Sequence, residues 1–312
     1  MKDLTSYVFS FEEMIRGNFL YVDKTEYIWN LIRPSSAGYF LSRPRRFGKS
    51  LTLSTLKAVF EGKKELFKGL ALYDKPYDWK PYPIIHLSFG DYNIVSNAKD
   101  ELPNYLMTKV RKIAQEYSIP LPDDTPANCF SSLIDKIYET SQVVILVDEY
   151  DKPILDNITG PDVKDLLKIL KGFYSVLKDR NDKERLLFVT GVSKFCHGSL
   201  FSDLNNLTDI TMDARYATMP GYTQEELETN FSEQIAAVEK KQNLNHADYL
   251  AEIKNWYDGF RFEENAESVY NPVSLAKFFE SGGKFSNYWF ETGTPRFLVD
   301  LSKSRDSISI HH

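Results

Sequence analysis

A Gly-Lys-Ser turn set between a short apolar run and an amphipathic stretch constrains the fold of this chain more than any other feature. The run Gly38–Leu41 (G-Y-F-L) is typical of a buried strand, and helical spacing continues from about Gly48 to Glu61. The loop between them, Arg43–Ser50, reads R-P-R-R-F-G-K-S and matches the phosphate-binding pattern G-x-x-x-x-G-K-[ST] except that Arg43 replaces the first glycine. The order strand, loop and helix therefore predicts an α/β unit with an anion-binding helix N-terminus.

The loop carries the groups that phosphate binding requires. Backbone N–H groups at a helix N-terminus bind phosphate oxygens, Lys49 would reach the β- and γ-phosphates, and the Ser50 hydroxyl would hold Mg²⁺. Arg43 removes the small size and free φ of glycine at the loop entry, but none of the groups that touch phosphate. An ordinary β-turn-α with a lysine by chance is the alternative. The predicted nucleotide-binding residues of this loop are Arg45, Arg46, Phe47, Gly48, Lys49, Ser50 and Leu51. Arg45 and Arg46 would flank the phosphates, or both would face solvent or an acidic partner.

A second apolar run ends in two acids. Val143–Val147 is continuously apolar and β-branched, as in a strand covered on both faces, and it leads directly into Asp148 and Glu149. This is the Walker B arrangement, in which Asp148 would bind Mg²⁺ and Glu149 would polarise the attacking water. A pair of surface acids at a strand end is the alternative. The two motifs together, in this order, favour a P-loop nucleotide site over either alternative.

A third run, Leu186–Thr190, is another buried-type strand. A polar residue on the strand next to a Walker B strand often senses the γ-phosphate. Thr190 is the first candidate for that role and Ser193 the second, while a hydroxyl satisfied by local backbone is the alternative. The predicted catalytic residues are therefore Glu149, Lys49 and Thr190, and the predicted metal ligands are Ser50 and Asp148.

Alternating strands and helices predict an α/β core with a five-stranded, mainly parallel sheet and helices on both faces. Beyond Pro220 a capping box at Thr223–Glu226 predicts a helix through Val238, and Asp258-Gly259 between aromatic runs predicts a hairpin. We expect the core at residues 1–220, a helical or winged-helix unit at 221–304, and a tail at 305–312 that is partly a tag. The Asn271-Pro272 and Thr294-Pro295 steps each predict a helix start.

Composition narrows the function classes. There are 38 Lys and Arg against 44 Asp and Glu, a net charge of −6, which disfavours a strongly basic nucleic-acid binder but leaves a local basic groove open. Cys129 and Cys196 are isolated, so a reducing compartment fits better than a disulfide scaffold. The N-terminus lacks an apolar signal core, and the most apolar run is too short to span a bilayer. We expect a soluble cytoplasmic protein without a membrane partner.

The same residues carry a family resemblance. R-P-R-R-F-G-K-S, V-D-E-Y-D-K-P-I and T-G-V-S-K-F, together with Y-V-D-K-T at 21–25 and W-Y-D-G-F-R-F at 256–262, resemble the predicted AAA-ATPase-like family of bacterial P-loop proteins across nearly the whole chain. The resemblance implies ATP and Mg²⁺ as ligands, and it makes Arg43 part of the family pattern. It implies that Tyr21 or Val22 lines the base pocket and that Thr292–Pro295 closes over the nucleotide. It also implies a C-terminal PD-(D/E)-x-K nuclease domain in longer relatives, for which this chain ends too early.

Three functions follow for testing. The first is Mg²⁺-dependent hydrolysis of ATP, in which Lys49 and Mg²⁺ stabilise charge and Glu149 positions water. The second is a switch that binds nucleotide without turnover. The third is a DNA-binding adaptor that uses the C-terminal unit, where Trp256, Tyr257, Phe260 and Phe262 would stack bases or simply pack. The effector, the oligomeric state and the source of any arginine finger stay open.

Overall fold

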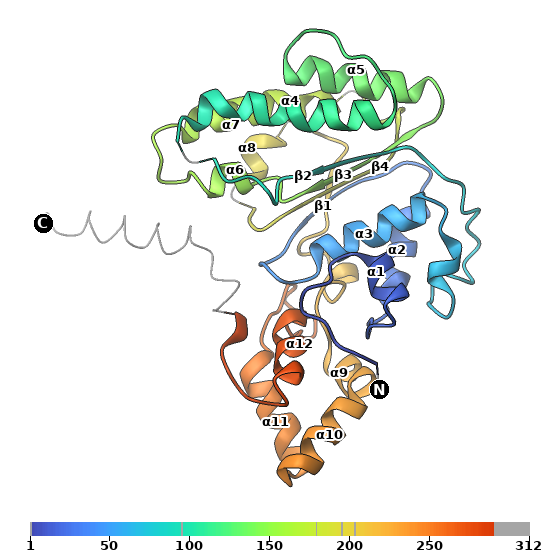
Figure 1. The fold of residues 1–312 in the computed structure, drawn as a ribbon, viewed down its shortest axis with the longest axis vertical. Helices are drawn as coiled ribbons and strands as arrows, with labels where there is room; N and C mark the ends of the chain where they lie inside the picture. Colours follow the sequence, from blue (N-terminus) through green and yellow to red (C-terminus); the bar gives the residue numbers. More distant parts are fainter. Residues whose placement is uncertain (1, 95, 179, 195, 203, 290–312) are drawn as a thin grey trace, which may run out of the picture. The chain divides into compact units, whose positions relative to one another are not determined.

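A parallel sheet organises the chain. The computed structural model describes residues 2–94, 96–178, 180–194, 196–202 and 204–289. The strands are β1 (Gly38–Ser42), β2 (Ile84–Ser88), β3 (Val143–Asp148), β4 (Glu184–Gly191) and the two-residue β5 (Thr208–Asp209). Their order is β2-β3-β4-β1-β5, and the pairs β2/β3, β3/β4 and β1/β4 are parallel (Figure 1). The predicted α/β fold with a five-stranded, mainly parallel sheet is confirmed.

The described residues form two compact units that alternate along the chain. Among the described residues, unit 1 takes 2–33, 43–79 and 209–289, and unit 2 takes 34–42 and the described part of 80–208. The segment after Pro220 therefore shares a compact unit with residues near the N-terminus. The contiguous domain bounds 1–220 and 221–304 stay a prediction, and the tail 305–312 lies outside the described residues.

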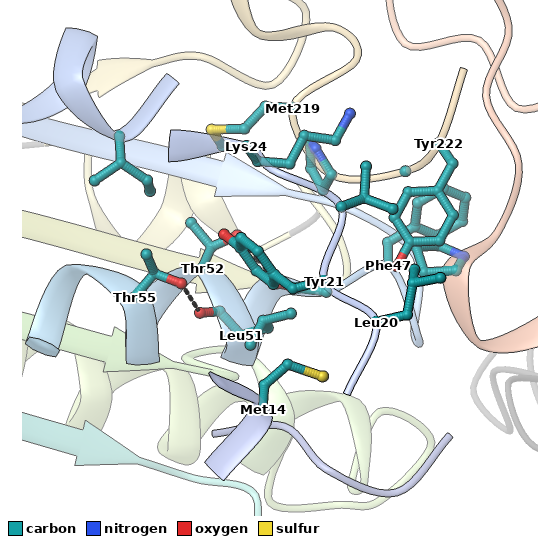
Figure 2. A pocket seen from close by; sticks show the side chains of 16 residues that line it. Met14, Leu20, Tyr21, Lys24, Phe47, Leu51, Thr52, Thr55, Met219 and Tyr222 are labelled. Atoms are coloured by element: carbon teal, nitrogen blue, oxygen red, sulfur yellow. Dashed lines mark hydrogen bonds between the residues drawn. The ribbon is translucent and has the colours of Figure 1, made fainter. Parts of the chain in front are cut away.

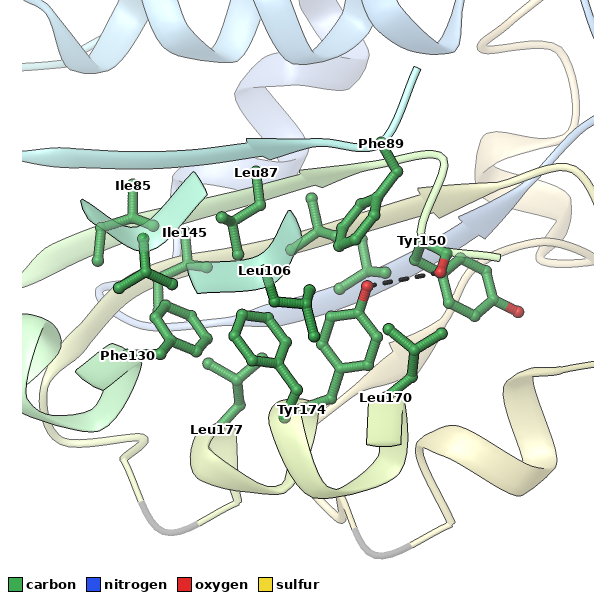
Figure 3. Packing of buried hydrophobic residues seen from close by; sticks show 14 of the residues in the cluster. Ile85, Leu87, Phe89, Leu106, Phe130, Ile145, Tyr150, Leu170, Tyr174 and Leu177 are labelled. Atoms are coloured by element: carbon green, nitrogen blue, oxygen red, sulfur yellow. Dashed lines mark hydrogen bonds between the residues drawn. The ribbon is translucent and has the colours of Figure 1, made fainter. Parts of the chain in front are cut away.

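Unit 2 contains strands β1 to β4 and their helical cover. The helices α4 (Ala98–Glu116), α5 (Pro126–Tyr138) and α7 (Val163–Tyr174) pack on one another, and α4 and α5 also contact the sheet (Figure 1). Every residue of β3 and β4 is buried, as their unbroken apolar runs predict. Side chains from the sheet meet those of the helices in one core (Figure 3) that includes Ile85, Leu87, Phe130, Ile145, Leu170 and Tyr174. Three short elements complete this unit: α6 (Lys152–Leu155), the 3₁₀ helix η2 (Ser175–Leu177) and α8 (His197–Leu200).

Unit 1 is mainly helical. Its first part holds α1 (Phe11–Arg16), α2 (Thr25–Ile32), α3 (Lys49–Phe60) and the 3₁₀ helix η1 (Lys64–Phe67). Its second part holds the 3₁₀ helix η3 (Ala214–Tyr216), α9 (Gln224–Asn230), α10 (Ser232–Gln242), α11 (His246–Tyr257) and α12 (Pro272–Glu280). The helices α9 to α12 surround an apolar core that includes Leu227, Ile253, Tyr270 and Phe278.

Two details after Pro220 differ from the sequence prediction. The helix that begins at the Thr223 capping box ends at Asn230, and a second helix begins at Ser232, because Phe231 turns into the core between them. The expected hairpin at Asp258-Gly259 is wrong in its first arm, since Trp256 and Tyr257 end α11. After that turn, Phe260 forms an isolated antiparallel bridge with Val269, and Tyr270 forms another with Tyr222. The predicted helix start at Asn271-Pro272 is confirmed, with the Asn271 side chain accepting from the Ser274 N–H at 2.9 Å.

No helix in the described part of the chain combines the length and the apolarity that a membrane span requires. Cys129 and Cys196 are both buried free thiols.

Candidate nucleotide site

The loop Arg43–Gly48 follows β1 directly and ends where α3 begins. Two of its residues adopt left-handed backbone, Arg46 at a φ of 69° and Gly48 at a φ of 78°. Gly48 is the N-cap residue of α3, and its carbonyl accepts from the N–H and the hydroxyl of Thr52. A Cβ atom at Gly48 would meet no other atom within 4 Å. Glycine is therefore required there by backbone conformation, and open space faces the helix N-terminus where a ligand would bind.

Lys49 folds back on its own loop. Its Nζ donates to the carbonyl of Arg43 at 3.0 Å and to that of Pro44 at 2.9 Å, and the side chain is only 6% exposed. These two carbonyls hold the buried ammonium at the entry of its own loop. Ser50, the second residue of α3, is exposed.

The other predicted loop residues divide by environment. Phe47 is fully buried in an aromatic cluster, with its ring centroid 4.7 Å from that of Phe260 and 5.3 Å from that of Phe262. Any contact of Phe47 with phosphate would therefore come from its backbone. Arg45 and Arg46 are half-buried, and the Arg46 guanidinium lies 5.6 Å from the centre of the Phe9 ring.

A pocket opens beside this loop, wholly within unit 1 (Figure 2). Its empty volume is about 540 Å³ with the solvent-open part included. Phe47, Gly48 and Leu51 form one wall, and Tyr21 and Val22 line it as well. The structure thus brings together the two residues that the resemblance assigns to the base pocket and three residues of the phosphate-binding loop and helix.

The remaining walls were not identified from sequence. They are Met219–Tyr222 and Pro272, the first residue of α12, together with Lys24 from the Y-V-D-K-T segment. The Lys24 ammonium bonds the Glu226 carboxylate at 2.6 Å and the Thr218 carbonyl at 2.9 Å. Its burial lowers the pKa of Lys24, an effect that Glu226 opposes. The predicted closing element, Thr292–Pro295, lies outside the described residues, whereas the other predicted helix start, Asn271-Pro272, reaches the pocket.

The second group of predicted residues lies in unit 2, at the carboxyl ends of β3 and β4. The side chains of Asp148 and Thr190 are buried, and the Thr190 hydroxyl donates to Oδ1 of Asp148 at 2.7 Å. The alternative that this hydroxyl serves only local backbone is therefore wrong. A buried carboxylate held by a charge-assisted hydrogen bond is preorganised as an oxygen ligand for a hard cation.

Glu149 leaves the strand with a backbone that is unusual for its residue type. Its φ is 55°, in the left-handed region that a side chain rarely adopts. Its carboxylate lies beside the end of β2, because a Cβ atom at Gly90 would be 3.6 Å from Oε2 of Glu149. Backbone strain of this kind costs about 1–3 kcal/mol and concentrates at functional sites.

Asp151 is a further residue of this edge that the sequence analysis did not select. It is fully buried, and its carboxylate accepts from the backbone N–H groups of Val192 at 3.0 Å and Ser193 at 2.9 Å. The Tyr150 hydroxyl donates to the Ser193 carbonyl at 2.9 Å. Ser193, the second sensor candidate, is thus held through its backbone. The third acid of V-D-E-Y-D was the available signal, since an acid three residues after a buried strand can return to the same sheet edge.

The donors of this edge suit magnesium. Mg²⁺ is bound in proteins by one or two carboxylates plus waters and substrate phosphates, so it does not require a cage of protein ligands. Across the described ranges, no three or more His, Cys, Asp or Glu side chains cluster closely enough to form such a cage. The Asp148 carboxylate and the Ser50 hydroxyl, each within its own unit, have the hard oxygen chemistry that the ion prefers.

Comparisons with known proteins give the family. A protein from Azotobacter chroococcum mcd 1, described as "Uncharacterized protein in vnfD 5'region", is 40% identical over 292 residues, which are 92% of this chain and 53% of that protein. The chain therefore spans about half the length of this relative. The solved Walker-type ATPase PABY2304 of Pyrococcus abyssi aligns with 94% of this chain and 74% of its own at a TM-score of 0.37 and 13% identity. Residues 7–201 match the family described as Predicted AAA-ATPase, and the chain belongs to that family.

Proposed function

We propose that the chain is a magnesium-dependent ATPase module. The observation that carries the proposal is the pocket that opens at Gly48, where Tyr21 and Val22 line the same space as the phosphate-binding loop. Adenine would occupy this pocket, and the phosphates would lie at the N-terminus of α3, where backbone N–H groups and Lys49 meet them. Membership of the Predicted AAA-ATPase family supports the choice of nucleotide.

We assign Asp148, Glu149 and Thr190 of unit 2 to the same nucleotide because of the order in which the phosphate-binding loop and the acidic strand end follow each other along the chain. Mg²⁺, when bound, would neutralise phosphate charge and polarise the γ-phosphorus for attack. Asp148 and Ser50 would hold it, and Thr190 would keep the Asp148 carboxylate in orientation through its 2.7 Å hydrogen bond. Glu149 would accept a proton from the attacking water, and Lys49 would stabilise the charge that develops on the γ-phosphate.

A switch that binds ATP without hydrolysis remains the second proposal. The position of Glu149 favours this switch. With left-handed backbone at Glu149, its carboxylate lies beside Gly90, whereas hydrolysis would require that carboxylate to be aligned with the attacking water. The DNA-binding adaptor stays a prediction: Phe260 and Phe262, both half-buried, pack on Phe47, whereas Trp256 is exposed. A cytoplasmic location and a nuclease domain in longer relatives stay predictions.

The test measures ATP affinity and phosphate release on the purified chain, with Mg²⁺ and with EDTA. Charge-assisted contacts contribute about 1.5–3 kcal/mol, so Lys49→Ala should lower ATP affinity roughly tenfold or more. Lys57→Ala is the matched control, because Lys57 lies on the same helix and its side chain is 44% exposed. Equal ATP affinity for wild type and Lys49→Ala, with the fold intact, would overturn the assignment.

A further inference from the structure

The side chain of Arg43 is an anchor between distant parts of unit 1. It is 1% exposed, and its guanidinium donates to the carbonyl of Thr211 at 2.6 Å and to that of Tyr216 at 3.2 Å. The Cζ atom also lies 4.0 Å from the centre of the Phe262 ring. Burial lowers the pKa of Arg43, and Asp209 opposes this. A planar guanidinium can bond two carbonyls and stack on a ring at once, which a lysine ammonium cannot do.

The backbone of the same residue holds Lys49. Of the two carbonyls that accept from Nζ of Lys49, one belongs to Arg43 and the other to Pro44, the next residue. The proline ring restricts the backbone on both sides of that peptide. Because this stretch of backbone is short and stiff, anchoring the Arg43 guanidinium also fixes the position of the carbonyls that orient Lys49.

The anchor points belong to the segment that walls the pocket. Thr211 precedes η3 and Tyr216 is its last residue, and the chain continues from Tyr216 to Met219–Tyr222. Gly221 in that wall contacts the loop, because a Cβ atom there would be 3.4 Å from the Phe47 ring. Arg43 thus ties the entry of the phosphate-binding loop to another segment that lines the pocket, Met219–Tyr222.

We propose that Arg43 is a positioning residue that sets the orientation of Lys49 by anchoring the loop entry to Thr211 and Tyr216. The arginine that replaces the first glycine of the pattern would then supply, through its side chain, the fixed loop entry that a glycine turn supplies elsewhere. This inference rests on the proposed function for its consequence in nucleotide binding, and on the structure alone for its consequence at Lys49.

The first experiment compares ATP with AMP in Arg43→Met, which keeps most of the side-chain volume and removes both donors. Lys49 acts on the β- and γ-phosphates, which AMP lacks, so ATP affinity should fall about tenfold, as for Lys49→Ala. AMP affinity should stay within about twofold, since Arg43 itself does not line the base pocket. Equal losses for ATP and AMP would show general disruption of the site and would overturn the proposal.

A double-mutant cycle separates action through Lys49 from independent action. If Arg43 works through Lys49, then Arg43→Met added to Lys49→Ala should lower ATP affinity no further. Multiplying losses would overturn the proposal. Arg185→Met is the matched control, because Arg185 is also buried, donates to the Pro34 carbonyl at 2.8 Å and lies 5.6 Å from the Tyr82 ring. It should cost stability and leave the ATP-to-AMP ratio unchanged.

A readout without nucleotide distinguishes failure of this inference from failure of the proposed function. Labelling by an amine-reactive reagent, followed by peptide mass spectrometry, should show Lys49 reacting severalfold faster in Arg43→Met than in wild type, with no change in Arg185→Met. Unchanged labelling overturns the positioning role even if ATP binds. If wild type binds neither ATP nor AMP, the proposed function fails and the labelling result alone decides the role of Arg43.

Discussion

The phosphate-binding loop in unit 1 and the carboxyl edge of the sheet in unit 2 are held by opposite kinds of hydrogen bond. In the loop, buried cations donate to backbone carbonyls, as Arg43 does to Thr211 and Lys49 does to Pro44. At the sheet edge, buried carboxylates accept from neighbours, as Asp148 does from the Thr190 hydroxyl. The first arrangement places cationic side chains at the loop, and the second places carboxylates at the sheet edge.

The difference also separates binding from chemistry. A loop held by the donors of two side chains can be loosened by replacing either one, whereas strands β3 and β4 fix their edge through a continuous parallel register from Val144 with Leu186 to Val147 with Val189. We therefore expect substitutions in the loop to act mainly on ATP affinity. Substitutions at the sheet edge should act mainly on turnover and on the dependence on Mg²⁺.

The largest effect should come from Glu149. Glu149→Gln keeps the size of the side chain and loses the charge that accepts a proton, and general-base contributions amount to about 10²–10⁴-fold. Steady-state phosphate release should fall by that factor while ATP affinity by calorimetry stays within a few-fold. The contrasting variant is Asp148→Asn, which should weaken Mg²⁺-dependent binding as well.

Two outcomes would contradict this difference between the loop and the sheet edge. A Glu149→Gln variant that releases phosphate at the wild-type rate would make Glu149 a bystander. If the wild type releases no phosphate at all while ATP still binds, the switch proposal replaces hydrolysis.

A smaller effect is expected from the hydroxyl that holds Asp148. Thr190→Val keeps the shape of the side chain and removes the donor, and hydrogen bonds to charged groups contribute about 1.5–3 kcal/mol. We expect the Mg²⁺ concentration for half-maximal ATP binding to rise roughly tenfold. Thr25→Val is the matched control, since the Thr25 hydroxyl is equally buried and donates to Oδ1 of Asp23 at the same 2.7 Å. A similar Mg²⁺ shift in both variants would reduce the Thr190 bond to a structural role.

Much of the sheet edge and of the loop was predictable because local pattern determines both. An apolar run into Asp148, a run that ends at Thr190, and a strand followed by Gly48-Lys49 place their polar residues at strand ends without knowledge of the partners. Since parallel strands end at one edge, the meeting of Asp148 with Thr190 followed from the strand assignment once the two strands were neighbours.

What local pattern could not supply is long-range packing. The carbonyls that anchor Arg43 lie 168 and 173 residues away in the chain, and the pocket walls at Met219–Tyr222 and Pro272 are equally remote from the loop. The spacing of apolar residues indicates that a side chain is buried, but not which residues it contacts. The alternation of the two units along the chain and the left-handed backbone of Glu149 are likewise decided by tertiary context.

The last contrast with Asp148 concerns stability, and it lies at the amino end of β4. Glu184 is 2% exposed, and its Oε1 finds no hydrogen-bond partner within the described part of the chain. Burial raises the pKa of Glu184 to about 8, with Arg180 opposing the shift and Asp182 adding to it. The sheet therefore buries two carboxylates in different ways: Asp148 accepts a hydrogen bond from Thr190, whereas burial favours the neutral form of Glu184.

The pH dependence of unfolding should reveal that contrast. The native pKa of Glu184 is above its unfolded value, so the native state binds the proton more tightly, and stability is lost as pH rises from about 4.5 to about 8. A difference of one in pKa corresponds to about 1.4 kcal/mol, so Glu184→Gln, which cannot ionise, should gain on the order of a few kcal/mol over wild type between pH 5 and pH 8. Thermal unfolding at the two pH values measures the gain, and Glu139→Gln, a change at a carboxyl that is 65% exposed, is the control and should show none. An equal difference in Tm between Glu184→Gln and wild type at both pH values would mean that a donor satisfies Glu184 after all, and the two ends of the strand would no longer differ.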